Sequence, residues 1–439
     1  MNGNPKSRRR LLRTWVVALM AVPLLASCGL AKGGQARGGD GGGSGGDAPS
    51  SVTFWHEFTA GSEANGVKAL DSGFAKQGKY TLKQRPIANE QLFTVLRTGL
   101  AGSLPPDVVQ YEGYQQTRDF AKAGQLTDLT DLWTANADKF LLSDSAKAAC
   151  TYQGKIYCIP YTFATGSQIY YNADLLKKQG IEPPKTYEEF LAAAQKLKDA
   201  GVTPISIGAK DGWPAEHWWM LFLVQRCGVA TVEKAETKNG AKFTDPCFVQ
   251  AAQDLATLGE RGFFSKGAAS DDYGTALSVY RAGKSAFFQT GSWLASGLES
   301  EPTTFTTGIL TFPRMAEDKH PGDITGAITH VFGIPTKAKN PEGARAFLEY
   351  MLGDEATTAW AKAGNLSLRE GMVEQFGGPT LQPLWKSVLS ADASLPWMEN
   401  ELPPGVGEDK IYNGTAALVS GRTSPEDFVK SVQTALDAA

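Results

Sequence analysis

The sequence is poor in the residues that bind metals and carry out nucleophilic chemistry. Its 439 residues include four histidines and five cysteines, and no two cysteines form a Cys-x-x-Cys pair. Zinc sites commonly draw on such pairs, so a zinc site is disfavoured. A phosphate-binding loop, a His-Glu-x-x-His helix and a nucleophile elbow between a strand and a helix are also missing. We therefore expect no metal, no cofactor and no catalytic residue of these classes.

Positive charge is scarce once the N-terminal segment is set aside. The formal net charge is −3, and five positive residues but no acidic residue lie before Cys28. Removal of that segment changes the formal charge to −8, which disfavours contact with a phosphate backbone. We expect no nucleic-acid partner.

The N-terminal apolar run over 15–26 is too short to span a bilayer, and it follows a basic segment. This pattern predicts a signal peptide over 1–27. The segment Ser7–Arg13 fits a twin-arginine export pattern as well as an ordinary secretory one, so the export route stays open.

The four residues Leu-Ala-Ser-Cys that end at Cys28 resemble a bacterial lipobox. Cleavage before Cys28 would leave a lipidated N-terminal cysteine, and the alternative is a chance cysteine after an ordinary cleavage site. Residues 28–50 are rich in glycine and predict a flexible tether. The folded body is expected from Ser51 onward, with room for two domains of about 190 residues each.

The remaining cysteines predict two disulfides. A short turn at Gln153–Gly154 places Cys150 opposite Cys158 in a hairpin, within reach of a disulfide. Cys227 and Cys247 then form the second pair, because an even number of cysteines in an oxidising compartment favours full pairing.

Strand and helix patterns alternate along the chain. Apolar strands are expected over 52–56 and 80–85, and helices over 66–74 and 89–101. A capping box formed by Thr186 and Glu189 begins another helix, and a strand follows over 202–207. The alternation predicts an α/β fold.

Three motifs in one stretch carry a family resemblance. Gly-Lys-x-Tyr-x-x-Pro over 154–160, Tyr-Tyr-Asn-x-Asp-Leu over 170–175 and Pro-Pro-Lys-Thr-x-Glu-Glu-Phe over 183–190 stand in this order. They resemble the signature of extracellular solute-binding proteins of ATP-binding-cassette importers, the branch that includes the maltose-binding protein. Further similar motifs lie over 105–111, 283–293, 330–352 and 424–436.

The resemblance extends from Ser51 to Ala439 and implies a two-lobed α/β clamp with three hinge crossings. The N-terminal lobe is expected over 51–163 and 331–375. The C-terminal lobe is expected over 164–330 and 376–439.

A ligand of such a fold binds beyond the carboxyl ends of the strands, between the lobes. A sugar ring presents apolar C–H faces to aromatic rings and hydroxyls to carboxylates and amides. Each tryptophan has the alternative of filling the core. With Tyr412 as an alternative to Trp397, the candidate ligand-binding residues are Trp55, His56, Glu57, Tyr111, Glu112, Thr165, Trp213, Trp218, Trp293, His330, Asn365 and Trp397.

The resemblance implies a receptor and not an enzyme. We expect a monomer, lipid-anchored on the extracytoplasmic face of a bacterial cell membrane, that captures a mono- or oligosaccharide for the permease subunits of an ATP-binding-cassette importer. The ATPase must be another chain, because no phosphate-binding loop occurs here. Two alternatives stay open: an exported glycoside hydrolase, which needs two suitably spaced carboxylates, and a lipid-tethered sugar sensor or adhesion module. The identity of the sugar, or of another small solute, also stays open.

Overall fold

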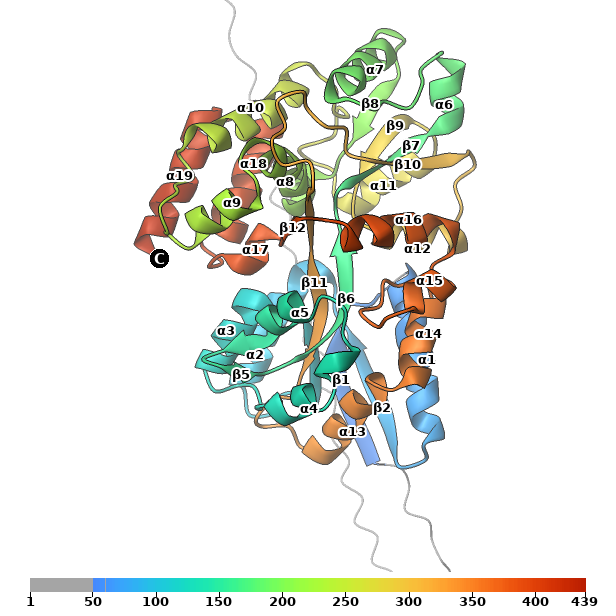
Figure 1. Cartoon of the computed structure of the whole chain (residues 1–439), viewed down its shortest axis with the longest axis vertical. Coiled ribbons are helices and arrows are strands. Elements are labelled where there is room, and N and C mark those ends of the chain that lie inside the picture. Colours follow the sequence, from blue (N-terminus) through green and yellow to red (C-terminus); the bar gives the residue numbers. More distant parts are fainter. Residues whose placement is uncertain (1–49, 60) are drawn as a thin grey trace, which may run out of the picture. The chain divides into compact units, whose positions relative to one another are not determined.

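A computed structural model of the chain describes residues 50–59 and 61–439 (Figure 1). The predicted signal peptide, the lipidation of Cys28 and nearly all of the tether lie outside the described residues. Within the described part, no helix is both long and apolar enough to cross a membrane.

The first of two main sheets has six strands, four of which come from residues 50–165. Its order is β12-β11-β3-β1-β2, and β6 pairs with β11 beside this path. Strands β1, β2 and β3 are parallel, whereas β11 runs antiparallel to both β3 and β6. The strands are β1 (Ser50–His56), β2 (Tyr80–Pro86), β3 (Val108–Tyr111), β6 (Ile159–Thr165), β11 (Asp323–Gly333) and β12 (Ala393–Leu395).

Helices cover the first sheet because their apolar stripes face it. In α1, for example, Val67, Leu70 and Phe74 are buried at helical spacing. The helices that follow its strands are α1 (Gly61–Lys76), α2 (Asn89–Ala101), α3 (Tyr114–Lys122), α4 (Thr130–Thr134), η1 (Ala137–Lys139), α5 (Ser143–Cys150), α13 (Pro341–Met351), α14 (Asp354–Lys362), α15 (Met372–Phe376) and α16 (Gly378–Leu389).

The second sheet has four strands in the order β10-β7-β9-β8. Strand β9 is parallel to β8 and antiparallel to β7, which pairs in turn with β10. Its strands are β7 (Gln168–Asn172), β8 (Thr203–Ser206), β9 (Ser285–Gln289) and β10 (Thr307–Thr311). The helices in this part of the chain are α6 (Ala173–Lys178), α7 (Tyr187–Asp199), η2 (Ala209–Asp211), α8 (Trp213–Arg226), α9 (Val229–Glu236), α10 (Pro246–Glu260), α11 (Tyr273–Arg281), α12 (Trp293–Ser300), α17 (Met398–Glu401), η3 (Gly407–Tyr412), α18 (Asn413–Val419) and α19 (Pro425–Ala438).

Strands β6 and β11 lie side by side and link the two sheets (Figure 1). They pair from Gly326 opposite Thr165 to Phe332 opposite Ile159. Strand β6 ends at Thr165, and β7 of the second sheet begins three residues later at Gln168. This short link allows little slack between the sheets, so the chain around Thr165 is positioned by both.

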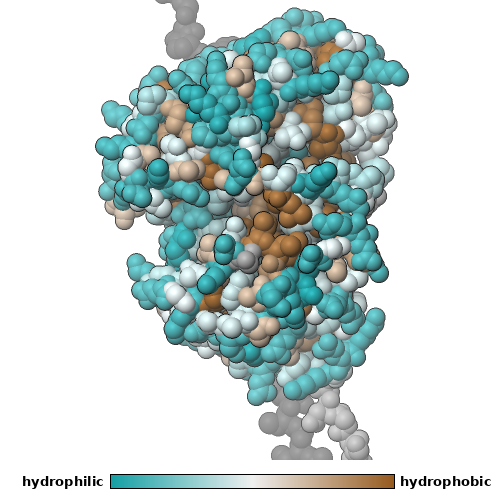
Figure 2. All heavy atoms as spheres, viewed as in Figure 1, coloured by the Kyte–Doolittle hydropathy of each residue, from teal (hydrophilic) through white to brown (hydrophobic). Residues whose placement is uncertain are grey.

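The local motifs are present as predicted. Thr186 and Glu189 form the capping box of α7, and Ser424 caps α19. The surface seen in Figure 2 is largely hydrophilic, with hydrophobic residues gathered near its middle. Among the described residues, the large hydrophobic side chains with high exposure are Leu104 and Leu389.

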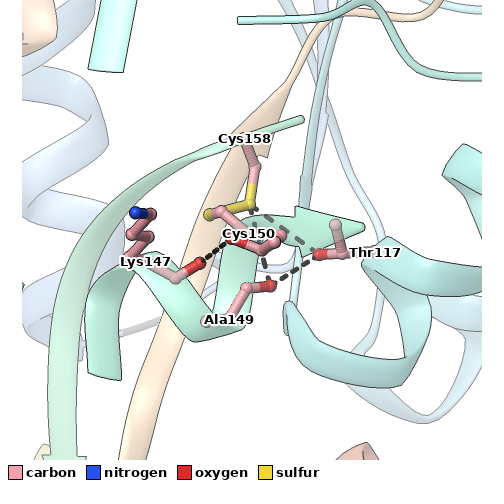
Figure 3. Close-up of a disulfide and its surroundings, with 6 residues drawn as sticks. Thr117, Lys147, Ala149, Cys150 and Cys158 are labelled. Carbon is pink, nitrogen blue, oxygen red and sulfur yellow. Dashed lines mark hydrogen bonds between the residues drawn. A yellow bond between two sulfur atoms is a disulfide. The ribbon is translucent and has the colours of Figure 1, made fainter. Parts of the chain in front are cut away.

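Both predicted disulfides are present. Cys150 is bonded to Cys158 with a Cα–Cα distance of 5.1 Å, and Cys227 to Cys247 with 5.3 Å. The hairpin consists of β4 (Thr151–Tyr152) and β5 (Lys155–Ile156). Cys150 itself ends helix α5 and is not in the strand, although the Tyr157 amide still donates to its carbonyl. In Figure 3 the Thr117 hydroxyl donates to the carbonyl of Ala149 beside this disulfide, at 2.8 Å.

Candidate ligand-binding site

Acidic side chains meet at the carboxyl ends of two neighbouring strands of the first sheet. Glu57 directly follows β1 and Glu112 directly follows β3, while Glu63 lies in the first turn of α1. His330 on β11 faces them, with its Nε2 2.9 Å from Glu57 Oε1 and 3.5 Å from Glu63 Oε1. We call these four residues the acidic cluster.

The backbone and a buried amide hold the acidic cluster in place. The Gln110 side chain, on β3, accepts a hydrogen bond from the Glu57 amide at 2.9 Å and donates to Glu57 Oε1 at 3.2 Å. His330 has a φ of 54°, which is unfavourable for a residue with a side chain. Such a conformation persists only where the surroundings fix it, and it is common at functional sites.

Two carboxyl groups of the acidic cluster, those of Glu63 and Glu112, hold protons more tightly than a free glutamate. Burial, and next the repulsion of Glu57, raise the pKa of Glu112 well above its usual range. Burial raises the pKa of Glu63 to about 7 against the opposing effect of His330. The carboxyl groups of Glu57 and Glu112 have oxygens within 4.8 Å of each other, so negative charge on one opposes ionisation of the other.

A group of aromatic rings comes from helices in the part of the chain that forms the second sheet. Trp213 and His217 lie in the first turns of α8, whereas Tyr273 and Trp293 begin α11 and α12. Trp397 directly precedes α17. We call these five residues the aromatic cluster.

The rings of the aromatic cluster are in mutual contact. The Trp213 ring centroid lies 4.8 Å from that of Tyr273 and 5.9 Å from that of Trp293. His217 stacks on Trp397 at 4.4 Å. The Trp293 indole N–H donates to the Tyr273 hydroxyl at 3.2 Å, which orients both rings. The backbone at Gly166 lies close to the Trp397 ring. A side chain there would not fit, because a Cβ would lie 2.8 Å from the ring.

A second pair of carboxyl groups lies behind the aromatic cluster. Glu216 on α8 and Glu399 on α17 interact directly, and one nitrogen of His217 lies within 4.8 Å of an oxygen of each. Burial raises the pKa of Glu216 well above its usual range and that of Glu399 to about 7. Burial also lowers the pKa of His217 to about 3, so this imidazole is neutral at physiological pH.

Two interactions connect the acidic cluster with the second sheet's part of the chain. The side chain of Asn400, next to Glu399, donates to Glu112 Oε2 at 3.4 Å. Burial is the main cause of the raised pKa of Tyr273, and Glu63 of the acidic cluster adds to it. The site therefore combines carboxyl groups from the first sheet with rings from the second, which is the arrangement that grips a polar ligand with apolar faces.

Six predicted residues belong to the two clusters: Glu57, Glu112, His330, Trp213, Trp293 and Trp397. Thr165 lies close by, at the link between the sheets. It is buried, and its hydroxyl donates to the carbonyl of Thr325.

The structure does not bring the other predicted residues into either cluster. Trp55 packs against Arg85 and Gly99. His56 is buried beside Gln84, and this burial lowers its pKa to about 4. Tyr111 fills the core against Phe120.

Trp218 and Asn365 also have structural contacts. Trp218 is 0% exposed and packs among Phe190, Phe264 and other rings of the second sheet's core. The Asn365 amide donates to the carbonyls of Ser62 and Trp360. For Trp218, these contacts agree with the alternative that a tryptophan fills the hydrophobic core.

Sequence reasoning missed Glu63, Glu216, His217, Tyr273 and Glu399. A signal for two of them existed in helix α8. Residues three and four positions apart share a helix face, so Glu216 and His217 follow Trp213 on one side. Trp218, five positions on, points elsewhere, and the helical period would have favoured His217 over it.

The architecture and the paired clusters define a two-sheet α/β binding protein. The solved structure of a chitin oligosaccharide binding protein has this fold, with a TM-score of 0.78, 23% sequence identity, and coverage of 89% of this chain and 99% of that one. A model of the bacterial extracellular solute-binding protein family matches residues 58–358. The chain therefore belongs to that family, whose members bind solutes as receptors and are not enzymes.

Two proteins with related sequences align with most of this chain. The alpha-glucosides-binding periplasmic protein of Rhizobium meliloti is 27% identical over 397 residues, which cover 84% of each chain. The multiple sugar-binding protein of Streptococcus mutans is 26% identical over 313 residues, which cover 70% of this chain and 72% of that protein.

Proposed function

We propose that this chain is the extracytoplasmic receptor of an ATP-binding-cassette importer for a mono- or oligosaccharide. The observation that carries the proposal is the aromatic cluster facing the acidic cluster. Indole rings such as those of Trp213 and Trp293 stack on the C–H faces of sugars, and carboxylates accept bonds from their hydroxyls. The relatives named for alpha-glucosides and for multiple sugars support the same class of ligand.

The carboxyl geometry argues against the hydrolase alternative. A glycosidase needs two carboxyl groups about 5 to 9 Å apart, one on each side of the scissile bond. Here the carboxyl oxygens of Glu57 and Glu112, and likewise those of Glu216 and Glu399, lie within 4.8 Å of each other. Neither pair therefore has the separation that this chemistry needs.

The mechanism that we propose is closure of two lobes around the sugar. The lobes would comprise residues 51–163 with 331–375 and residues 164–330 with 376–439, joined by three hinge crossings. Support comes from the links between the sheets near Thr165 and Asp323, where β6 leads to β7 and β10 leads to β11. A ligand that contacts both lobes binds the closed form more tightly, and only this difference drives closure.

A screen of melting temperature against saccharides and compatible solutes tests the function. A bound sugar raises the apparent stability by mass action, by about 2.7 kcal/mol at a concentration one hundred times Kd. Calorimetry should then give 1:1 binding, and chromatography should recover the sugar intact. Turnover of the sugar, or a response to compatible solutes alone, would contradict a saccharide receptor.

We also propose that a lipid on Cys28 anchors the receptor to the outer face of the cell membrane, with the permease as partner. The lipobox-like residues before Cys28 support this. The Cys28→Ser variant should leave the detergent phase in a detergent-partition assay, whereas the parent chain should stay in it. Equal partition of both would remove the anchor from the proposal.

A further inference from the structure

The site is rich in carboxyl groups and poor in fixed positive charge. Glu63, Glu112, Glu216 and Glu399 all belong to it, and in the described part of the chain none of them forms an ion pair with a lysine or an arginine. The basic side chain that faces them is His330, whose Nε2 lies 2.9 Å from Glu57 Oε1 and 3.5 Å from Glu63 Oε1. Of the four carboxyl groups, Glu63 has the His330 imidazole beside it, whereas no ion pair of Glu112, Glu216 or Glu399 occurs among the described residues.

Carboxyl groups lie within 4.8 Å of each other at Glu57 and Glu112, and again at Glu216 and Glu399. Two carboxylates in contact repel each other unless a proton lies between them. At Glu112 and Glu216, burial makes the ionised carboxylate still less favourable and raises the pKa of each well above its usual range. A ligand ammonium at such a contact would supply both the charge and up to three N–H donors.

Buried acceptors in and beside the aromatic cluster also lack donors. Glu216 is 0% exposed, and within the described residues neither of its oxygens has an N–H or hydroxyl donor in good hydrogen-bond geometry. His217 is 4% exposed, and its Nδ1 has no partner in that part of the chain. Since His217 is neutral at physiological pH, its free nitrogen can accept a hydrogen bond.

The aromatic cluster is suited to a cation as well as to a sugar ring. The faces of Trp and Tyr rings carry negative potential, and groups of such rings bind ammonium ligands. The cation–π contacts of the described residues all involve other rings, such as Arg85 over Trp55 and Arg261 over Phe263. The faces of Trp213, Tyr273, Trp293 and Trp397 are therefore not occupied by the protein's own lysines or arginines.

We propose that the preferred ligand is a saccharide with a free, protonated amine, whose ring lies on the tryptophans and whose ammonium lies among the carboxyl groups. This inference rests on the proposed sugar-binding function and specifies its substrate class. It predicts discrimination against neutral sugars of the same shape, because a neutral group leaves the buried acceptors without a charged donor.

Matched pairs of sugars test the inference by titration calorimetry at pH 7. The pairs are glucosamine with glucose, galactosamine with galactose, and the β-1,4-linked glucosamine dimer with its N-acetylated form. In at least one pair, we expect the amine member to bind ten times more tightly or better. Raising the salt concentration should reduce this preference, because charge–charge attraction is screened.

Two variants locate the preference in the site. Glu112→Gln, in the acidic cluster, and Glu216→Gln, beside the aromatic cluster, retain the shape of the side chain and prevent it from carrying a negative charge. Each should reduce the preference for the amine member about tenfold, and melting curves without ligand establish that each variant is folded. The matched control is Glu260→Gln at the exposed end of α10, which should leave the preference unchanged.

The outcomes separate this inference from the proposed function. Equal or tighter binding of neutral members would overturn the inference and leave a sugar receptor. Binding of no sugar in the panel would overturn both. The groups Glu57–Glu112–His330 and Glu216–His217–Glu399 could also hold a divalent metal ion. Stabilisation by Ca²⁺, Mn²⁺ or Zn²⁺ alone, reversed by EDTA and without preference for amines, would replace the amine by a metal.

Discussion

Arg118 on α3 and Glu401 on α17 form an ion pair with an Nη2–Oε2 distance of 2.9 Å. Helix α3 follows β3 of the first sheet, whereas α17 contacts η3 near the C-terminal helices. Arg118 also donates to the carbonyl of Glu401, and the neighbouring Asn400 donates to Glu112. Helix α17 is thus attached to the acidic side of the site by charged and polar contacts.

We expect Arg118→Ala to weaken sugar binding about two- to fivefold. The two side chains are 34% and 20% exposed, so their attraction is screened and contributes only about 0.5–1 kcal/mol. Loss of this attraction favours forms in which α17 leaves α3, and the apparent affinity falls with the population of the competent form. Calorimetry measures the affinity.

The control for Arg118 is another arginine with exposed ion pairs. Arg345 pairs with Asp131 and Glu349, away from both clusters. Arg345→Ala should leave the affinity unchanged. An equal loss of affinity in both variants would show that α17 attachment does not affect binding.

The buried carboxyl groups should make the ligand-free protein less stable as the pH rises. Burial raises the pKa of Glu399 to about 7, whereas an unfolded glutamate titrates near 4.5. Between these values the folded state binds more protons than the unfolded state, so the free energy of unfolding falls with increasing pH. His217 has the opposite sign, because its lowered pKa contributes stability above pH 6.5 that is lost towards pH 3.

A comparison with Glu399→Gln isolates the carboxyl effect. At pH 5 the variant and the parent should have similar stability, since the carboxyl is then protonated in the folded state. At pH 8 the variant should be more stable by about 1–3 kcal/mol, because it has no buried charge to form. Urea unfolding at both pH values measures this. Parallel pH curves for the two proteins would contradict it.

Local sequence patterns predicted local structure correctly. The capping box at Thr186, the turn at Gln153–Gly154 and both disulfides depend on residues close in sequence. The α/β class followed from the alternation of strand and helix patterns. Three short motifs carried the resemblance to the family, and the family match over 58–358 agrees with it.

The composition of the site was harder to predict because it depends on contacts between distant segments. Glu63 and Tyr273 are more than 200 positions apart, yet the charge of one affects the pKa of the other. Glu216 on α8 comes close to Glu399 only because α17, far along the chain, packs beside it in the fold. No pattern within either segment indicates that contact.

Removal of the disulfide between Cys227 and Cys247 should destabilise the second part of the chain. The bond closes a loop with a sequence separation of 20 and restricts the unfolded state. A loop of this size contributes about 3 kcal/mol in the chain-entropy model. The double variant Cys227→Ala/Cys247→Ala should lose about this much free energy of unfolding. Unchanged stability of the double variant would argue against the bond in the exported protein.

The first residue of α8 and a residue five positions later offer the sharpest test of the site. Trp213 is partly exposed and contacts Tyr273 and Trp293 of the aromatic cluster. Trp218 is 0% exposed and lies in the hydrophobic core. The same substitution on one helix therefore removes a ligand contact at one position and core packing at the other.

Trp213→Ala should lower sugar affinity about tenfold to a hundredfold, because a stacked aromatic face contributes roughly 1–3 kcal/mol to binding. Its melting temperature without ligand should fall only slightly. Trp218→Ala should instead lose about 3–5 kcal/mol of unfolding free energy through a cavity, and its folded fraction should bind sugar with nearly the parent affinity. Calorimetry and melting curves on both variants give the two readouts. If Trp213→Ala lost stability but kept its affinity, Trp213 would be a core residue and the aromatic cluster would lose its role in binding.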